Sequence, residues 1–184
     1  KKISKKLFEI GCKTFFVATL EEGTALRQTL NQLDSKKLCK IYILNGLNSK
    51  NYQNFIISKL IPVLNSEHEI NCWIKHKNQT STNNPVAIHF DTGMNRLGIP
   101  LNMIECEEKI QTLNNLNLSL VMSHMACADE PENKLNFMQL EKFKLVLNKF
   151  PNIKSSLANS AATLVDTKYH FDLVRPGIAL YGFN

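Results

Sequence analysis

Short apolar runs recur along this chain of 184 residues, and a stretch with helical spacing separates each run from the next. Such runs are too short for ordinary helices and suit strands that are buried on both faces. Strands that alternate with helices predict a parallel sheet with helical crossovers. The expected strands cover residues 14–18, 41–44, 61–64, 86–90, 118–122, 153–158 and 171–174.

The intervening helices are predicted from apolar residues three and four positions apart and from capping residues. Thr19, followed by the acidic Glu21 and Glu22, is expected to begin a helix that runs through Leu30. The other helices are expected over residues 1–10, 51–60, 67–77, 101–113, 132–150 and 161–165. About seven strand–helix units predict an α/β chain of the (β/α)8 TIM-barrel type that lacks one strand. A dinucleotide-binding sheet is disfavoured because no GxGxxG loop follows a strand.

Composition narrows the functional classes. The net charge is +6, but no stripe of lysine and arginine with interleaved aromatic residues appears, so nucleic-acid binding is not indicated. The five cysteines form no CxxC pair and have no histidine at metal-ligand spacing, which favours reduced thiols over disulfides or a zinc site. No apolar stretch is long enough to cross a bilayer, and no signal-peptide core follows the first lysines. We therefore expect a cytoplasmic protein without a metal or a membrane partner.

Polar residues follow several predicted strands, at the end where a barrel carries its functional groups. Arg96 lies in a turn just after the strand at 86–90, and its planar fork of donors could hold a carboxylate or a phosphate. From the spacing alone, an arginine that only covers a surface fits equally well. His124 follows the strand at 118–122 and could be an acid or base, a ligand or an ordinary loop residue. Cys127 has no evident base partner and is expected to be an inert thiol.

Two loops near the end of the chain fit a phosphate site. Asn159 and Ser160 begin a short helix whose unpaired backbone N–H groups favour an anion, although an ordinary helix cap is the alternative. Gly177 would let a phosphate approach the backbone N–H groups of Gly177 and Ile178. Barrels often bind phosphate in the loops after their last two strands, so we expect the two loops to act together.

Four ordered motifs resemble those of alanine racemases, barrel enzymes that use pyridoxal 5'-phosphate. They are Asp-Thr-Gly-Met-Asn-Arg-Leu-Gly, Ser-His-Met-Ala-Cys-Ala-Asp-Glu, Ala-Asn-Ser-Ala-Ala-Thr and Val-Arg-Pro-Gly-Ile-Ala-Leu-Tyr-Gly. The opening Phe-Phe-Val-Ala-Thr-Leu-Glu-Glu-Gly-Thr-Ala-Leu-Arg also resembles their second strand and helix. The resemblance covers nearly the whole chain. It implies that residues 1–184 are a partial N-terminal barrel domain with the first strand missing and the family's C-terminal β domain absent.

The resemblance implies a role for each matching residue. Arg96 resembles the arginine that holds the substrate carboxylate near the phenolic oxygen of the cofactor. Arg175 resembles the arginine that donates to the pyridine nitrogen, and His124 resembles the histidine that supports it. An arginine cannot readily give that nitrogen a proton, so the ring stays a weaker electron sink, which suits a racemase. The implied phosphate-binding groups are Asn159, Ser160, Gly177 and Ile178.

His89 departs from the family pattern. Many members have a carbamylated lysine there, two residues before the aspartate of the arginine loop, and it steadies the arginine. A histidine cannot form a stable carbamate, so the sequence leaves the orientation of Arg96 open. The family's Schiff-base lysine would precede Lys1, and its second base, a tyrosine of the partner subunit, would follow Asn184. Because racemisation needs a group on each face of the α-carbon, we expect this chain alone to be inactive.

The function implied by the resemblance is interconversion of L- and D-alanine, which supplies D-alanine for peptidoglycan, in a cytoplasmic homodimer. Three alternatives stay open. The first is another pyridoxal-phosphate amino-acid racemase of the same fold, and the second is a non-catalytic truncated remnant. The third is a barrel enzyme that acts on a phosphorylated metabolite.

Overall fold

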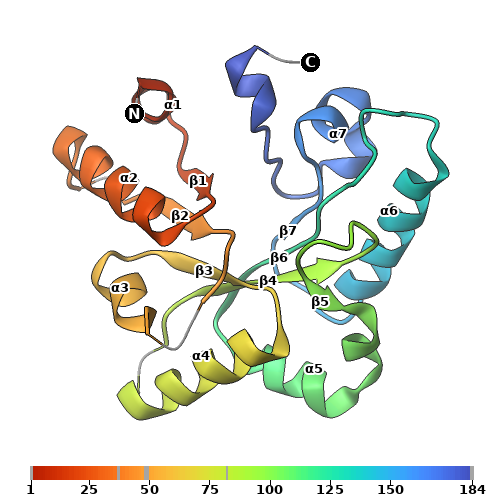
Figure 1. The fold of residues 1–184 in the computed structure, drawn as a ribbon, viewed down its shortest axis with the longest axis horizontal. Helices are drawn as coiled ribbons and strands as arrows, with labels where there is room; N and C mark the ends of the chain where they lie inside the picture. The colour runs from red at the N-terminus through yellow and green to blue at the C-terminus, as the bar shows by residue number, and fades with distance from the viewer. Residues whose placement is uncertain (1, 37, 48–49, 82, 183–184) are drawn as a thin grey trace. The chain divides into compact units, whose positions relative to one another are not determined.

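The computed structural model describes residues 2–36, 38–47, 50–81 and 83–182, so Lys1, where the first predicted helix starts, lies outside the described residues. The chain divides into two compact units (Figure 1). The first unit comprises Lys1–Leu64 and His68–Asn84, and the second comprises Asn65–Glu67 and Pro85–Asn184. In the described part of the chain, no helix has the length and apolar character needed to span a membrane.

The first unit alternates parallel strands with helices. Its strands are β1 (Thr14–Val17), β2 (Lys40–Ile43) and β3 (Ile61–Leu64). Its helices are α1 (Lys2–Glu9), α2 (Leu20–Leu33), α3 (Tyr52–Ile57) and most of α4 (Glu67–Thr80). β2 pairs in parallel with β1 on one side and with β3 on the other. Every residue of β3 is buried, as expected for a strand covered on both faces.

Side chains hold the start and the middle of α2 in place. The helix begins at the predicted position, where Thr19 and Glu22 form a capping box that satisfies free N–H groups of the first turn. Farther along, the buried Arg27 guanidinium donates to the backbone carbonyl oxygens of Cys39 and Lys59, both at 2.8 Å. These bonds connect α2 to the segments that precede β2 and β3.

The second unit contains a parallel sheet in the order β4-β6-β7, and a short strand, β5, pairs with β4. Its strands are β4 (Val86–Asp91), β5 (Ile99–Pro100), β6 (Leu118–Met122) and β7 (Ser155–Ser156). Its α-helices are α5 (Glu107–Asn114), α6 (Lys134–Leu147) and α7 (Ser160–Val165), and its 3-10 turns are η1 (Leu101–Glu105), η2 (Thr167–Tyr169) and η3 (Ile178–Tyr181).

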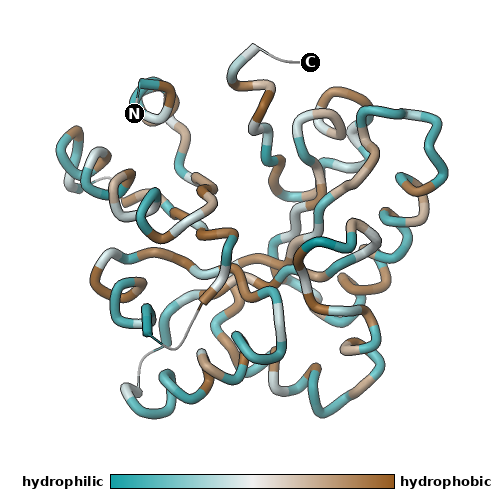
Figure 2. The backbone as a smooth tube through the Cα atoms, viewed as in Figure 1, coloured by the Kyte–Doolittle hydropathy of each residue, from teal (hydrophilic) through white to brown (hydrophobic). Residues whose placement is uncertain are grey.

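Apolar side chains of the strands and of α6 are buried in the second unit. The apolar residues of β4 are fully buried, and Phe143 of α6 is buried as well. Figure 2 shows the contrast that drives this packing, because brown marks much of the strands while teal predominates along the loops. Since the strands are parallel, their carboxyl ends meet at one edge. That edge carries the loops that follow Asp91, Met122 and Ser156.

The predicted strand at residues 171–174 is wrong. This segment runs beside β7, but in the described part of the chain only two backbone–backbone bonds join them, from Asp172 N to Ser155 O and from Arg175 N to Ala158 O. The hydroxyl of Ser156 also donates to the carbonyl oxygen of Leu173. The Asp172 carboxylate accepts from the N–H and the hydroxyl of Ser155, both at 2.8 Å, which replaces regular strand pairing. Phe171 also has a φ of 50°, which a strand does not contain.

Three smaller differences concern element boundaries. β7 spans two residues rather than 153–158. The predicted helix over 101–113 is divided into η1 and α5, because Cys106 between them is extended, with φ −97° and ψ 112°. β5 was not predicted, since a strand of two residues has no periodicity to reveal it. The other predicted strands are confirmed within one or two residues at their ends.

Candidate functional site

All the site residues predicted from the sequence lie in the second unit. Arg96 lies in the loop between β4 and β5, and His124 lies just after β6. Asn159 and Ser160 lie at the start of α7, after β7. The segment after η2 carries the rest of the predicted set, which is Arg175, Gly177 and Ile178.

The loop that carries Arg96 is folded around one carboxylate. Oδ1 of Asp91 accepts the backbone N–H groups of residues 93, 94 and 95 at 2.9, 2.9 and 3.1 Å. Arg96 is exposed, and among the described residues its guanidinium makes no hydrogen bond or ion pair. Its donors are therefore available to an anionic ligand.

Arg175 is held by acceptors at the end of β6 and β7. Its guanidinium donates to the hydroxyl of Ser156 and to the carbonyl oxygen of Ser123. It also lies 3.3 Å from Nδ1 of His124. Because a guanidinium can only donate, Nδ1 of His124 accepts, and the proton of the neutral ring is assigned to Nε2. Burial lowers the pKa of Arg175 to about 9.

His89 and His124, the two buried histidines that feel the charges of Arg96 and Arg175, are uncharged at neutral pH, and these four residues form a cluster. Burial lowers the pKa of His124 to about 3, and the positive charges of Arg175 and Arg96 act in the same direction. Burial likewise lowers the pKa of His89 to about 4, with a further contribution from Arg175. Each imidazole therefore offers one donor and one acceptor at fixed positions.

His89 takes its orientation from Asn65. Its side chain is 7% exposed, and Nδ1 lies 2.9 Å from Oδ1 of Asn65. An amide oxygen accepts, so Nδ1 carries the proton and Nε2 keeps a lone pair. Asn65 was missed from the sequence, although it follows β3 directly and the rule that polar residues after strands form the site could have found it.

Ser160 joins the two loops that the sequence assigned to phosphate. Its Oγ accepts the N–H groups of Gly177 at 2.9 Å and Ala179 at 3.2 Å. A hydroxyl has two lone pairs and one proton, so both lone pairs are in use and the O–H remains to donate. A Cβ placed on Gly177 would meet nothing within 4 Å, so there is open space at this backbone.

Asn159 caps α7. Its Oδ1 accepts the N–H of Ala162 at 3.0 Å, and its Nδ2 donates to the carbonyl oxygen of Met125 at 3.1 Å. The cap geometry is the ordinary alternative considered for this residue. The same side chain connects the start of α7 to the loop after β6, which is the loop that carries His124.

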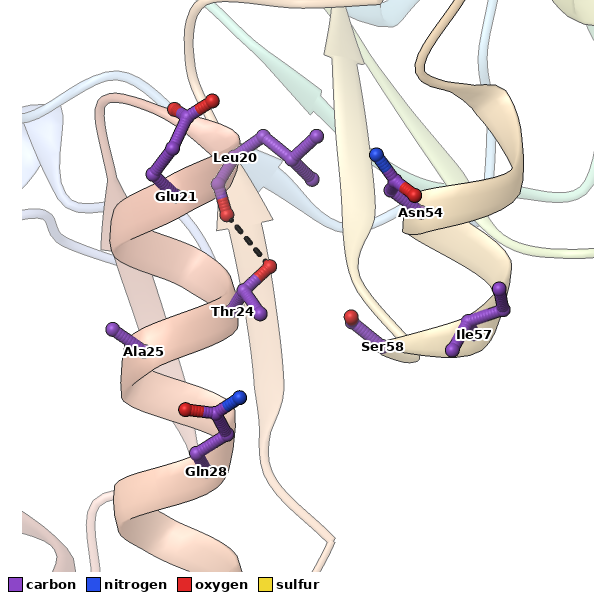
Figure 3. Close-up of a pocket in the computed structure, with 8 residues that line it drawn as sticks. All are labelled: Leu20, Glu21, Thr24, Ala25, Gln28, Asn54, Ile57 and Ser58. Carbon is purple, nitrogen blue, oxygen red and sulfur yellow. Dashed lines mark hydrogen bonds between the residues drawn. The ribbon is translucent and has the colours of Figure 1, made fainter.

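A groove elsewhere in the described residues is separate from this cluster. A groove of about 490 Å³ lies between α2 and α3 of the first unit (Figure 3), and none of the predicted site residues lines it. The hydroxyl of Thr24 in that groove already donates to the carbonyl oxygen of Leu20. No group of three histidine, cysteine or acidic side chains that could hold a metal occurs among the described residues.

The sequence and the fold of this chain are similar to those of known proteins. A family profile described as alanine racemase, N-terminal domain, matches residues 1–184. This chain belongs to the alanine racemase family. Alanine racemases of Rickettsia canadensis and Rickettsia typhi are 44% and 43% identical to it over 188 and 185 residues. Both alignments cover 99% of this chain, but 50% and 44% of those proteins, so the chain spans about half the length of the curated relatives it matches.

Solved structures of the family agree with this assignment. The alanine racemase of Bartonella henselae, whose structure holds covalently bound pyridoxal phosphate, has a TM-score of 0.83 and 34% identity, over 98% of this chain and 52% of that one. The biosynthetic alanine racemase of Pseudomonas aeruginosa has a TM-score of 0.83 and 28% identity, over 100% of this chain and 49% of that one. These matches confirm the predicted alanine racemase family and its barrel-type α/β fold.

Proposed function

We propose that the protein containing this chain is an alanine racemase that interconverts L- and D-alanine with pyridoxal 5'-phosphate. The observation that carries this proposal is the cluster of donors at the carboxyl ends of the strands in a member of the alanine racemase family. Arg175, Arg96 and the O–H of Ser160 can each donate to an anion or a lone pair, and both histidines are neutral.

The donor set fits the cofactor. Pyridoxal phosphate presents a pyridine nitrogen with a lone pair, a phenolic oxygen and a phosphate, all of which accept hydrogen bonds. Arg175 would donate to the ring nitrogen, with His124 supporting it. Ser160 would donate its O–H to the phosphate, beside Asn159 and the N–H group of Ile178. The N–H group of Gly177, which the sequence also assigned to the phosphate, instead donates to Oγ of Ser160 at 2.9 Å and so holds the loop. The open space at Gly177 leaves room for phosphate oxygens next to the backbone.

The substrate would be held by Arg96. A guanidinium without a partner among the described residues can bind a carboxylate through two parallel hydrogen bonds. The Asp91 carboxylate holds the loop, so the arginine is presented from an ordered segment. When bound, pyridoxal phosphate supplies the electron sink that acidifies the α-hydrogen of an amino acid.

The proton transfers are proposed to use groups outside this chain, namely the family's Schiff-base lysine and a tyrosine of the partner subunit in a homodimer. We accordingly expect the 184 residues alone to be inactive. Supply of D-alanine for peptidoglycan in the cytoplasm belongs to the same proposal.

The proposal is tested by Arg175→Ala and Arg175→Lys in the full-length protein. We expect the alanine variant to lose about a hundredfold or more in kcat, as for other lost electrostatic donors in active sites. The lysine variant should recover part of that loss, because it keeps the charge but not the planar fork. The absorption spectrum of the bound cofactor should change in both.

Lys144→Ala, at an exposed position of α6, is the control that should leave activity and spectrum unchanged. Arg175→Ala with wild-type activity and spectrum would remove the ring-nitrogen assignment. If the wild-type protein racemises serine, lysine or arginine faster than alanine, the proposed substrate is wrong, but the proposed reaction class, amino-acid racemisation, is kept.

A further inference from the structure

Gln139 is a buried polar residue of α6 that lies outside the predicted site. Its side chain is fully buried, and its amide is fully hydrogen-bonded. Oε1 accepts the backbone N–H of Ala126 at 2.9 Å, and Nε2 donates to the carbonyl oxygen of His124, also at 2.9 Å. The side chain therefore holds both sides of the loop that follows β6.

The remaining donor of the same amide reaches a different loop. Nε2 of Gln139 also donates to Oγ1 of Thr92 at 3.2 Å. Thr92 is 1% exposed and belongs to the loop that carries Arg96. A Cβ on Gly93 would lie 3.6 Å from Cγ of Gln139, so the backbone of that loop also packs against this side chain. One buried amide thus contacts the two loops that carry Arg96 and His124.

A second connection reinforces the first. Oγ1 of Thr92 lies 2.8 Å from Oγ of Ser123, and both side chains are buried. The carbonyl oxygen of Ser123 accepts from the guanidinium of Arg175. A continuous series of hydrogen bonds therefore runs from the Arg96 loop through Thr92 to the residues that hold Arg175.

We infer that Gln139 is a positioning residue that, with Thr92, sets the separation between Arg96 and the His124–Arg175 pair. This inference rests on the proposed function, in which the first group holds the substrate carboxylate and the second holds the cofactor ring. A buried amide with two donors and one acceptor can hold both loops in one register, whereas an apolar side chain of equal size cannot. Misplacement of such groups by about 1 Å can cost about a hundredfold in rate.

The experiment compares Gln139→Met and Thr92→Val in the full-length protein. Both replacements are nearly isosteric and remove the hydrogen bonds. Gln111→Met, at an exposed position of α5, makes the same change away from the loops. The kinetics are measured well below the unfolding temperature of each variant. We expect kcat/KM for alanine to fall tenfold to a hundredfold in Gln139→Met and by a smaller factor in Thr92→Val. Thr92→Ser, which keeps the hydroxyl, should recover most of the loss.

Two further readouts separate positioning from simple stability. The losses in the double variant should be less than additive, because both changes break the same Gln139–Thr92 hydrogen bond. Hydrogen exchange of the peptides that contain residues 92–98 and 124–128 should rise in Gln139→Met and stay unchanged in Gln111→Met. A folded Gln139→Met with kcat/KM within twofold of Gln111→Met would overturn the inference, as would strictly additive losses. If Gln139→Met does not fold, the comparison of kcat/KM between Thr92→Val and Thr92→Ser decides, and values within twofold of each other would overturn the inference.

Failure of the proposed function is recognised separately. A wild-type protein that binds pyridoxal phosphate but racemises no amino acid would refute the proposed function. In that case hydrogen exchange decides the inference: raised exchange in both peptides of Gln139→Met supports coupling of the loops, and unchanged exchange in the Arg96 loop overturns it.

Discussion

Gly98 closes the loop that presents Arg96, and its replacement by alanine is the sharpest test of how that loop is built. Gly98 has a φ of 119°, a region that residues with a side chain rarely adopt. A Cβ at this position would lie 2.6 Å from the backbone nitrogen of Asp91 and 3.0 Å from the carbonyl carbon of Phe90. These are backbone atoms of the buried strand β4, so they cannot move aside as a flexible side chain would.

The cost has two parts. Holding a non-glycine residue at such a φ costs about 1–3 kcal/mol. The steric overlap with β4 adds about 1–3 kcal/mol, as for other overpacked sites. Gly98→Ala should therefore lower the free energy of unfolding by about 2–6 kcal/mol. It should also raise KM for alanine, because relief of the overlap moves the loop that carries Arg96.

Gly11→Ala is the matched control, because Gly11 has a similar φ of 101° but a Cβ there would meet nothing within 4 Å. It carries the conformational cost alone. The assay is urea unfolding followed by circular dichroism, with steady-state kinetics on alanine for each variant. The reasoning is refuted if Gly98→Ala loses no more stability than Gly11→Ala, since the overlap with β4 would then have no energetic consequence.

Further predictions concern other parts of the chain. Thr19→Ala removes the side-chain cap of α2 and should cost about 1 kcal/mol in urea unfolding; an unchanged midpoint would mean that the cap is dispensable. In the folded chain the pKa of His89 is about 4 and that of His124 is about 3, whereas a histidine of the unfolded chain has a pKa of about 6.5. The unfolded chain therefore binds more protons than the folded chain between these pH values. Stability should fall as the pH drops below 6.5, by up to about 1.4 kcal/mol per pH unit for each histidine, and His89→Asn should remove about half of this slope. A pH slope of stability in His89→Asn equal to that of the wild type would contradict this prediction. Ser160→Ala leaves the Gly177 N–H without its acceptor and removes the O–H proposed to meet phosphate, so Kd for pyridoxal phosphate should rise about tenfold. Equal affinity, measured by fluorescence titration, would exclude Ser160 from the phosphate site.

Much of the fold could be predicted because local signals and burial agree. The apolar run at 86–90 is found as β4, and the threonine–glutamate pattern at Thr19 is found as a capping box. The segment at 171–174 shows where this agreement ends. Its apolar residues suit a strand, but the Asp172 carboxylate takes the Ser155 N–H that a neighbouring strand would use. A side-chain bond across 17 residues leaves no periodic trace in the sequence.

The candidate site was predictable where residues follow strands and unpredictable where they support them from behind. The loops with Arg96, His124 and Ser160 were expected from their position after strands, and the structure places all of them in the second unit. Gln139 lies within an amphipathic helix, where the sequence pattern only predicts a polar or a buried position. Its partners Ala126 and Thr92 are 13 and 47 residues away, so only the folded chain shows the connection.

The cluster formed by Arg96, Arg175, His89 and His124 has a consequence for enzymology. Its imidazoles gain protons only near pH 3 to 4, and burial puts the pKa of Arg175 at about 9. Between about pH 5 and pH 8 the imidazoles and the Arg175 guanidinium therefore keep the same protonation. The electrostatic potential that these groups create in the site is then independent of pH. Any bend in a pH–rate profile within that interval reports a group that lies elsewhere, in the substrate, the cofactor or a proton-transferring base.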